Sequence, residues 1–152
     1  MRTTQDNRLD HLTDRERQVA MEFVDRVRGR FDRKVIAAVL FGSRARGEAE
    51  SNSDMEVLVV MSNADPEIRK EIRHLAVEVW LEHNIYLSTH VWSQAQWHRL
   101  EELQTLLFQN IHRDGISLLE LSLLFIPAGE LFRSIQASVT LRAYPSTDTS
   151  ST

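Results

Sequence analysis

The chain has 152 residues, of which 42% are hydrophobic and 26% charged, and its formal net charge at pH 7 is −4. This length and composition are typical of one globular domain, and the negative charge argues against a general nucleic-acid binder, whose surface is basic. The absence of cysteine excludes disulfides, zinc-thiolate sites and thiol catalysis, and it is typical of a cytoplasmic protein. The longest apolar segment, 116–126, is interrupted by Glu120 and is too short to span a bilayer.

The N-terminal third predicts a polar lead-in over residues 1–11 and then a helix. Thr13-x-x-Glu16 has the form of a capping box, in which each residue binds the backbone N–H of the other. Apolar residues at helical spacing follow it, so we expect a helix over about 14–28 that stops near Gly29. The arginines on its polar face are interpreted as a solvated surface.

The next stretch reads as strand, turn and strand. The apolar run 35–41 predicts a strand that stops at Gly42-Ser43, and a second apolar run follows Asp54-Met-Glu56. Gly42 lets the backbone approach a ligand closely, and a helix starting after Ser43 would offer free N–H groups to phosphates. Asp54 and Glu56 are two residues apart, so on a strand both carboxylates point to one face. This pattern predicts a Mg²⁺ site for nucleotide chemistry.

The second half predicts a helix, a third strand and a further helix. Pro66 opens a pattern of apolar residues at helical spacing that ends near Asn84, and 85–92 alternates as a strand with Ser88 and His90 on one face. We expect one helix over 93–113, ended by Asp114-Gly115. Residues 116–126 fit either a helix or a strand, and 145–152 predict a disordered tail.

The central stretch carries a family resemblance. Gly42-Ser43, ten residues and then Asp54-x-Glu56, with Arg44-Ala-Arg46-Gly47 inside, resemble the signature of nucleotidyltransferases related to DNA polymerase β. The likeness is to minimal (MNT-type) members, which often act as antitoxins beside HEPN-type toxins. It covers a domain of about 12–119, followed by a C-terminal extension over 120–144. The usual pair is Asp-x-Asp, and the Ser-Asp-x-Glu seen here resembles kanamycin-type nucleotidyltransferases.

The resemblance implies an α/β fold, the polymerase β-like nucleotidyltransferase fold, with a small twisted mixed sheet of three to five strands. We expect helices on one face of that sheet and the active site on the other. Gly42 and Ser43 would hold the β- and γ-phosphates of ATP or another nucleoside triphosphate, and Asp54 and Glu56 would bind Mg²⁺. Arg44 or Arg46 would neutralise phosphate charge. A hydroxyl would then attack the α-phosphorus.

A third acid is missing from the pattern. Relative to the predicted helix start at Ser93, His90 takes the place of the carboxylate that many members carry, with Ser88 two residues earlier on the same face. His90 has two interpretations, a catalytic base or an ordinary strand residue. Catalysis is therefore uncertain at the level of the sequence.

Three functions follow. The first is transfer of a nucleoside monophosphate, AMP above all, onto a hydroxyl such as that of a HEPN-type toxin. The second is a degenerate module that binds a nucleotide or a partner protein. The third is modification of a small molecule of the aminoglycoside type, although the chain lacks the length for the second domain of such enzymes. The apolar segment after residue 116 would serve core packing or assembly into a homo-oligomer.

Overall fold

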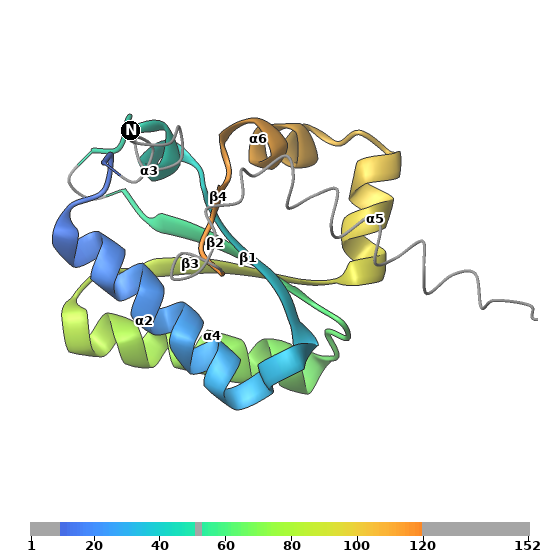
Figure 1. Ribbon diagram of the computed structural model, residues 1–152, viewed down its shortest axis with the longest axis horizontal. Coiled ribbons are helices and arrows are strands. Elements are labelled where there is room, and N and C mark those ends of the chain that lie inside the picture. Colours follow the sequence, from blue (N-terminus) through green and yellow to red (C-terminus); the bar gives the residue numbers. More distant parts are fainter. Residues whose placement is uncertain (1–9, 51–52, 120–152) are drawn as a thin grey trace, which may run out of the picture.

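The computed structural model describes residues 10–50 and 53–119 (Figure 1). The predicted extension over 120–144 and the predicted tail over 145–152 lie outside these ranges. In chain order the elements are α2 (Asp14–Phe31), η1 (Asp32–Lys34), β1 (Val35–Phe41), α3 (Ser43–Arg46), β2 (Met55–Met61), α4 (Pro66–His83), β3 (Leu87–Ser93), α5 (Gln94–Glu102), α6 (Leu106–Asp114) and β4 (Ile116–Ser117). None of the helices in the described ranges is long and apolar enough to cross a membrane.

The strands form one mixed sheet with the order β3-β2-β1-β4. β1 runs antiparallel to both β2 and β4, whereas β2 and β3 are parallel and are joined through α4. The small mixed sheet with helices that the sequence predicted is confirmed. Because β1 and β2 are antiparallel, the end of β1 lies beside the start of β2, and the parallel β3 starts at that same end.

Helices cover both faces of the sheet. Leu40 of β1 belongs to the core under α2 and α4, whereas its neighbours Val39 and Phe41 pack with Trp97 of α5 and Phe108 of α6. Figure 1 shows α2 and α4 on one side of the strands and α5 and α6 on the other. The expectation that helices back one face only is therefore wrong. The physical reason is that β1 and β2 are apolar at successive positions, so both of their faces need cover.

The single helix predicted over 93–113 is two helices. Ser93 begins α5 with a capping box to Gln96, which confirms the predicted start. α5 ends at Glu102, Gln104 adopts a φ of 48°, and the Thr105 hydroxyl accepts a hydrogen bond from the backbone N–H of Phe108 to begin α6. The two helices carry apolar residues at the same period, so the pattern hides the break between them.

The helix that was expected to stop at Gly29 continues to Phe31. Gly29 is exposed, and nothing lies within 4 Å of the position that a Cβ would take there. Val27 and Phe31 are buried at 1% and 7% exposure, so packing of the last turn against the core outweighs the low helix propensity of glycine.

Gly29→Ala is expected to raise the free energy of unfolding by about 0.5–1 kcal/mol, because alanine loses less backbone entropy than glycine in an exposed helix interior. Urea unfolding of the two proteins measures it. A decrease would place Gly29 in a left-handed helix cap, where alanine is strained.

Candidate functional site

The site is built around the turn at Gly42. β1 ends at Phe41, and Gly42 leads into α3 with a φ of 81°, a conformation that residues with a side chain rarely adopt. A Cβ on Gly42 would also overlap the carboxylate of Glu56. The backbone conformation therefore requires glycine, and the Glu56 carboxylate, which could turn away from a Cβ, lies directly against the backbone of the turn.

The two residues predicted to bind metal both lie at this end of the sheet. The register of β1 and β2 pairs Phe41 with Glu56. Asp54 lies one residue before β2 and is exposed, and Met55 between the two acids is completely buried. The buried Met55 holds the start of the strand in the core, while the acids on either side of it remain at least partly accessible. Two carboxylates beside a turn are a donor set of hard oxygens, which fits Mg²⁺.

α3 starts at Ser43, one residue earlier than the helix that the sequence analysis considered after Ser43. The helix is one turn long, and the backbone N–H of Arg46 donates to the carbonyl of Gly42 at 3.2 Å. Gly47 ends it with a φ of 74°, and Nδ1 of His11 lies 3.1 Å from the Ala45 carbonyl oxygen. The first N–H groups of a helix have no partner within it, so those of α3 face the region beside the turn.

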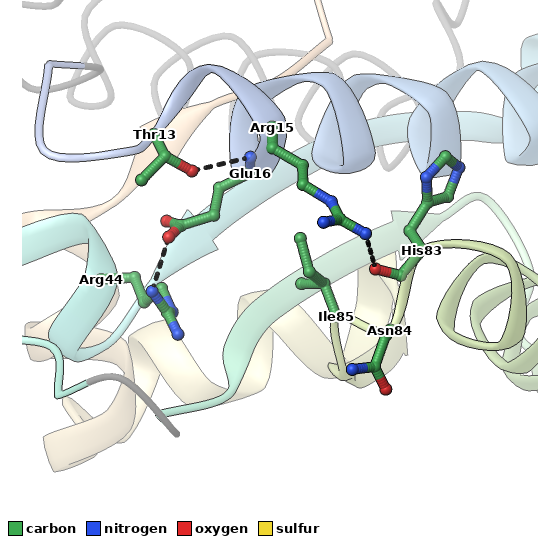
Figure 2. A pocket seen from close by; sticks show the side chains of 7 residues that line it. All are labelled: Thr13, Arg15, Glu16, Arg44, His83, Asn84 and Ile85. Atoms are coloured by element: carbon green, nitrogen blue, oxygen red, sulfur yellow. Dashed lines mark hydrogen bonds and ion pairs between the residues drawn. The ribbon is translucent and has the colours of Figure 1, made fainter.

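Arg44 is directed away from the turn, into the protein. Its Nη1 lies 2.8 Å from Oε1 of Glu16 on α2, and the two side chains are only 13% and 12% exposed (Figure 2). The Thr13 hydroxyl accepts from the backbone N–H of Glu16 at 3.1 Å, as a capping box requires, but the Glu16 carboxylate binds Arg44 across 28 positions of sequence. Sequence analysis missed this pair because the local cap already accounted for Glu16.

The pocket in Figure 2 is distinct from the turn. It has a volume of about 290 Å³, lies between the start of α2 and the end of α4, and is lined by Thr13, Arg15, Glu16, Arg44, His83, Asn84 and Ile85. Both of its arginines bind protein groups, since Arg15 donates to the His83 carbonyl at 2.5 Å and Arg44 pairs with Glu16. Neither is a ready partner for a phosphate.

Arg46 is the more accessible of the two arginines in the motif. Its side chain is 33% exposed, Nε lies 2.9 Å from the carboxylate of Glu48, and Nη1 lies 3.9 Å from that of Asp114. Exposed ion pairs of this kind are weak and exchange partners readily. Of the two arginines predicted to bind phosphate, Arg46 is the one that can turn toward a ligand at low cost.

On β3, the register separates Ser88 from His90. Ser88 pairs with Glu56, whereas His90 pairs with Leu58, two residues further into the sheet. The His90 ring lies 5.3 Å from that of Phe41 and 6.2 Å from that of Trp92. Its Nε2 is buried and has no hydrogen-bond partner among the described residues. The β3 residue beside Glu56 is therefore Ser88, and β3 places no carboxylate beside the predicted metal site.

A second cluster of ionisable groups joins α2 to α4. Glu22, Glu82 and His83 place potential ligand atoms within 4.8 Å of one another. The Arg26 guanidinium donates to Glu22 at 2.7 Å and to Glu82 at 2.6 Å, and it holds the pKa of Glu22 below its usual value. Because a cation already lies between the carboxylates, this cluster is an ion-pair network between helices.

Gly42→Ala is expected to lower the free energy of unfolding by about 1–3 kcal/mol from the backbone conformation alone, and to displace the Glu56 side chain. Urea unfolding measures the loss, with Gly29→Ala as the control because it adds the same methyl group where space is open. Equal stabilisation by both substitutions would contradict this geometry of the turn.

Comparison with solved structures gives distant likenesses. The chain is 18% identical to a Sulfolobus solfataricus protein assigned to the nucleotidyltransferases, with a TM-score of 0.45 over 77% of this chain and 87% of that one. It is 18% identical to a chain of a toxin–antitoxin complex with AMP-PNP, with a TM-score of 0.45 over 81% and 94%. It is 17% identical to a chain of the complex between a tri-AMPylated Shewanella oneidensis HEPN toxin and an MNT antitoxin, with a TM-score of 0.40 over 84% and 95%.

Comparison with family models covers the site itself. No curated protein matches the chain. The model for the nucleotidyltransferases of the polymerase β type matches residues 29–122, which is more than half of the chain and includes Gly42, both carboxylates and β3. The chain therefore belongs to the polymerase β nucleotidyltransferase family.

Proposed function

We propose that the chain binds a nucleoside triphosphate, ATP above all, together with Mg²⁺ at the sheet end formed by Gly42, Ser43, Asp54 and Glu56. The observation that carries the proposal is the contact between Gly42 and Glu56. Oε2 of Glu56 lies in the space that a Cβ of Gly42 would fill, so a cation bound by Glu56 would lie directly beside the turn. Phosphates held at the turn would therefore lie beside the carboxylates.

Each residue has a role set by its chemistry. The Ser43 hydroxyl and the N–H groups of the first turn of α3 would donate to the β- and γ-phosphates. Arg46 would exchange its exposed partner Glu48 for phosphate charge. Asp54 and Glu56 would hold the cation. When bound, Mg²⁺ supplies Lewis-acid stabilisation of phosphate oxygens.

The reaction that this arrangement supports is transfer of a nucleoside monophosphate to a hydroxyl group. The acceptor oxygen forms a bond to the α-phosphorus, the bond from that phosphorus to the bridging oxygen of the β-phosphate breaks, and pyrophosphate leaves. The hydroxyl proton passes to solvent. The protein supplies mainly position and complementary charge. For the acceptor we propose a hydroxyl on a partner protein, such as a HEPN-type toxin.

Transfer by the natural sequence is expected to be slow. Ser88 stands beside Glu56 where a third carboxylate would act, and His90 is packed against Phe41. Loss of a catalytic base costs a factor of about 10²–10⁴ in rate. The same observation favours the second candidate function, a module that binds nucleotide and partner without turnover.

Asp54→Ala is expected to abolish Mg²⁺-dependent ATP binding, because it removes an accessible carboxylate without touching the core. Ser43→Ala is expected to weaken binding by the loss of one donor. Calorimetric titration of ATP with Mg²⁺ measures both, with Asp25→Ala, an exposed acid of α2, as the control. Unchanged affinity in Asp54→Ala would remove the metal site from this end of the sheet.

Ser88→Asp is expected to raise the rate of AMP transfer, because it places a carboxylate beside Glu56. His90→Asp is expected to raise it less, since position 90 is paired with Leu58 and not with Glu56. Incorporation of labelled AMP into a HEPN-type partner measures transfer, and Thr89→Asp is the control because neighbouring residues of a strand point to opposite faces. A gain with His90→Asp and not with Ser88→Asp would make His90 the acid's position. Transfer by the wild type at several turnovers per second would show that no acid is missing.

A further inference from the structure

Arg44 joins three segments that are distant in the sequence. It belongs to α3, the helix that begins at the proposed phosphate turn, and its Nη1 pairs with Glu16 on α2. Its other two nitrogens, Nε and Nη2, donate to the carbonyl oxygen of Ser53 at 3.0 and 2.6 Å. Groups of the protein therefore bind all three nitrogens of the guanidinium. The third segment, which contains Ser53, leads directly into Asp54.

We propose that Arg44 is a positioning residue, which fixes the proposed metal ligand Asp54 relative to the phosphate turn. The inference rests on the proposed function. The Ser53 carbonyl belongs to the peptide unit that continues into the nitrogen and Cα of Asp54, and this unit is planar and rigid. Fixing the oxygen at one corner of the plane therefore restricts where the Asp54 Cα lies.

Ser53 is also held from its other side. Its backbone N–H donates to the carbonyl of Glu50 at 3.0 Å, and its hydroxyl accepts from the backbone N–H of Glu50 at 2.9 Å. Beyond Asp54, the N–H of Met55 donates to the Tyr86 carbonyl at 3.1 Å, where β2 begins. Asp54 therefore lies between two anchored residues, and Arg44 supplies the anchor that comes from the phosphate side of the site.

Stability alone is a poor explanation for the Arg44–Glu16 pair. Both side chains are mostly buried, at 13% and 12% exposure, and the cost of desolvating two charges offsets much of their attraction. Glu16 also forgoes the second half of its capping box, and its Oε2 is buried without a hydrogen-bond partner among the described residues. A guanidinium that Glu16 fixes in place can fix the orientation of the Ser53 carbonyl, which a mobile, exposed arginine cannot do.

The test substitution is Arg44→Lys. Lysine keeps the charge and can pair with Glu16 or bind the Ser53 carbonyl, but its single ammonium lacks the planar fork that bridges both. Groups that orient metal ligands typically change metal affinity 10- to 100-fold when removed. We therefore expect Mg²⁺-dependent ATP affinity to fall by about tenfold, with Arg30→Lys, in an exposed ion pair with Glu71, as the matched control.

Two further measurements separate positioning from general stability. In the Asp54→Ala background Arg44→Lys should leave the remaining, Mg²⁺-independent ATP affinity unchanged, because a residue that acts through Asp54 has nothing left to position. In the ligand-free protein, hydrogen exchange at the Ser53 and Met55 amides should quicken in Arg44→Lys, while exchange in α4 stays unchanged. If Arg44→Lys lowers the melting temperature, Glu16→Ala serves as the second variant. It should also lower Mg²⁺-dependent ATP affinity, but by a smaller factor.

The outcomes distinguish this inference from the function on which it rests. Wild-type protein that binds no ATP with Mg²⁺ would overturn the proposed function and the inference with it. Wild-type binding that Arg44→Lys leaves unchanged would overturn the inference alone, as would unchanged exchange at Ser53. An equal loss of affinity in the presence and absence of Asp54 would show that Arg44 binds the nucleotide itself.

Discussion

The site depends on the absence of a side chain at Gly42. Where another residue would carry a Cβ, this chain has the carboxylate of Glu56, and the backbone turns there through a conformation that favours glycine. The turn into α3 supplies N–H groups in that region, and the proposed cation would offset the negative charge of the carboxylate and of the bound phosphates.

The topology of the sheet brings these parts together. An antiparallel β1–β2 pair returns the chain to the turn at Gly42, and the parallel β3 starts at the same end. The register of β3 against β2 then decides which β3 side chain lies beside Glu56. Ser88 is paired with Glu56 and so lies at the site. His90, two residues further along the same strand, is paired with Leu58, and its ring contacts that of Phe41. The two positions are both half-buried, and they differ in the residue of β2 with which each is paired.

Much of this was predictable from the sequence because it depends on local patterns. The strands beside Gly42, the tight turn at Gly42-Ser43 and the position of the two carboxylates at the start of β2 follow from periodicity and turn chemistry. What the sequence could not predict depends on contacts between distant segments. The Glu16–Arg44 pair replaces half of a local cap, and the alignment of Ser88 with Glu56 is set by the pairing of two strands. Helices on both faces were missed because a continuous apolar strand does not indicate which later segment will cover it.

The central claim is that Asp54 and Glu56 hold a divalent cation beside the Gly42 turn. A crystal structure of the protein with Mn²⁺ and a non-hydrolysable ATP analogue tests it most directly, because Mn²⁺ replaces Mg²⁺ at oxygen sites and scatters anomalously. We expect an anomalous peak within coordination distance of both carboxylates, with the β- and γ-phosphates against the first turn of α3. A peak only at Glu22, Glu82 and His83, or nucleotide bound in the pocket between α2 and α4, would contradict this account.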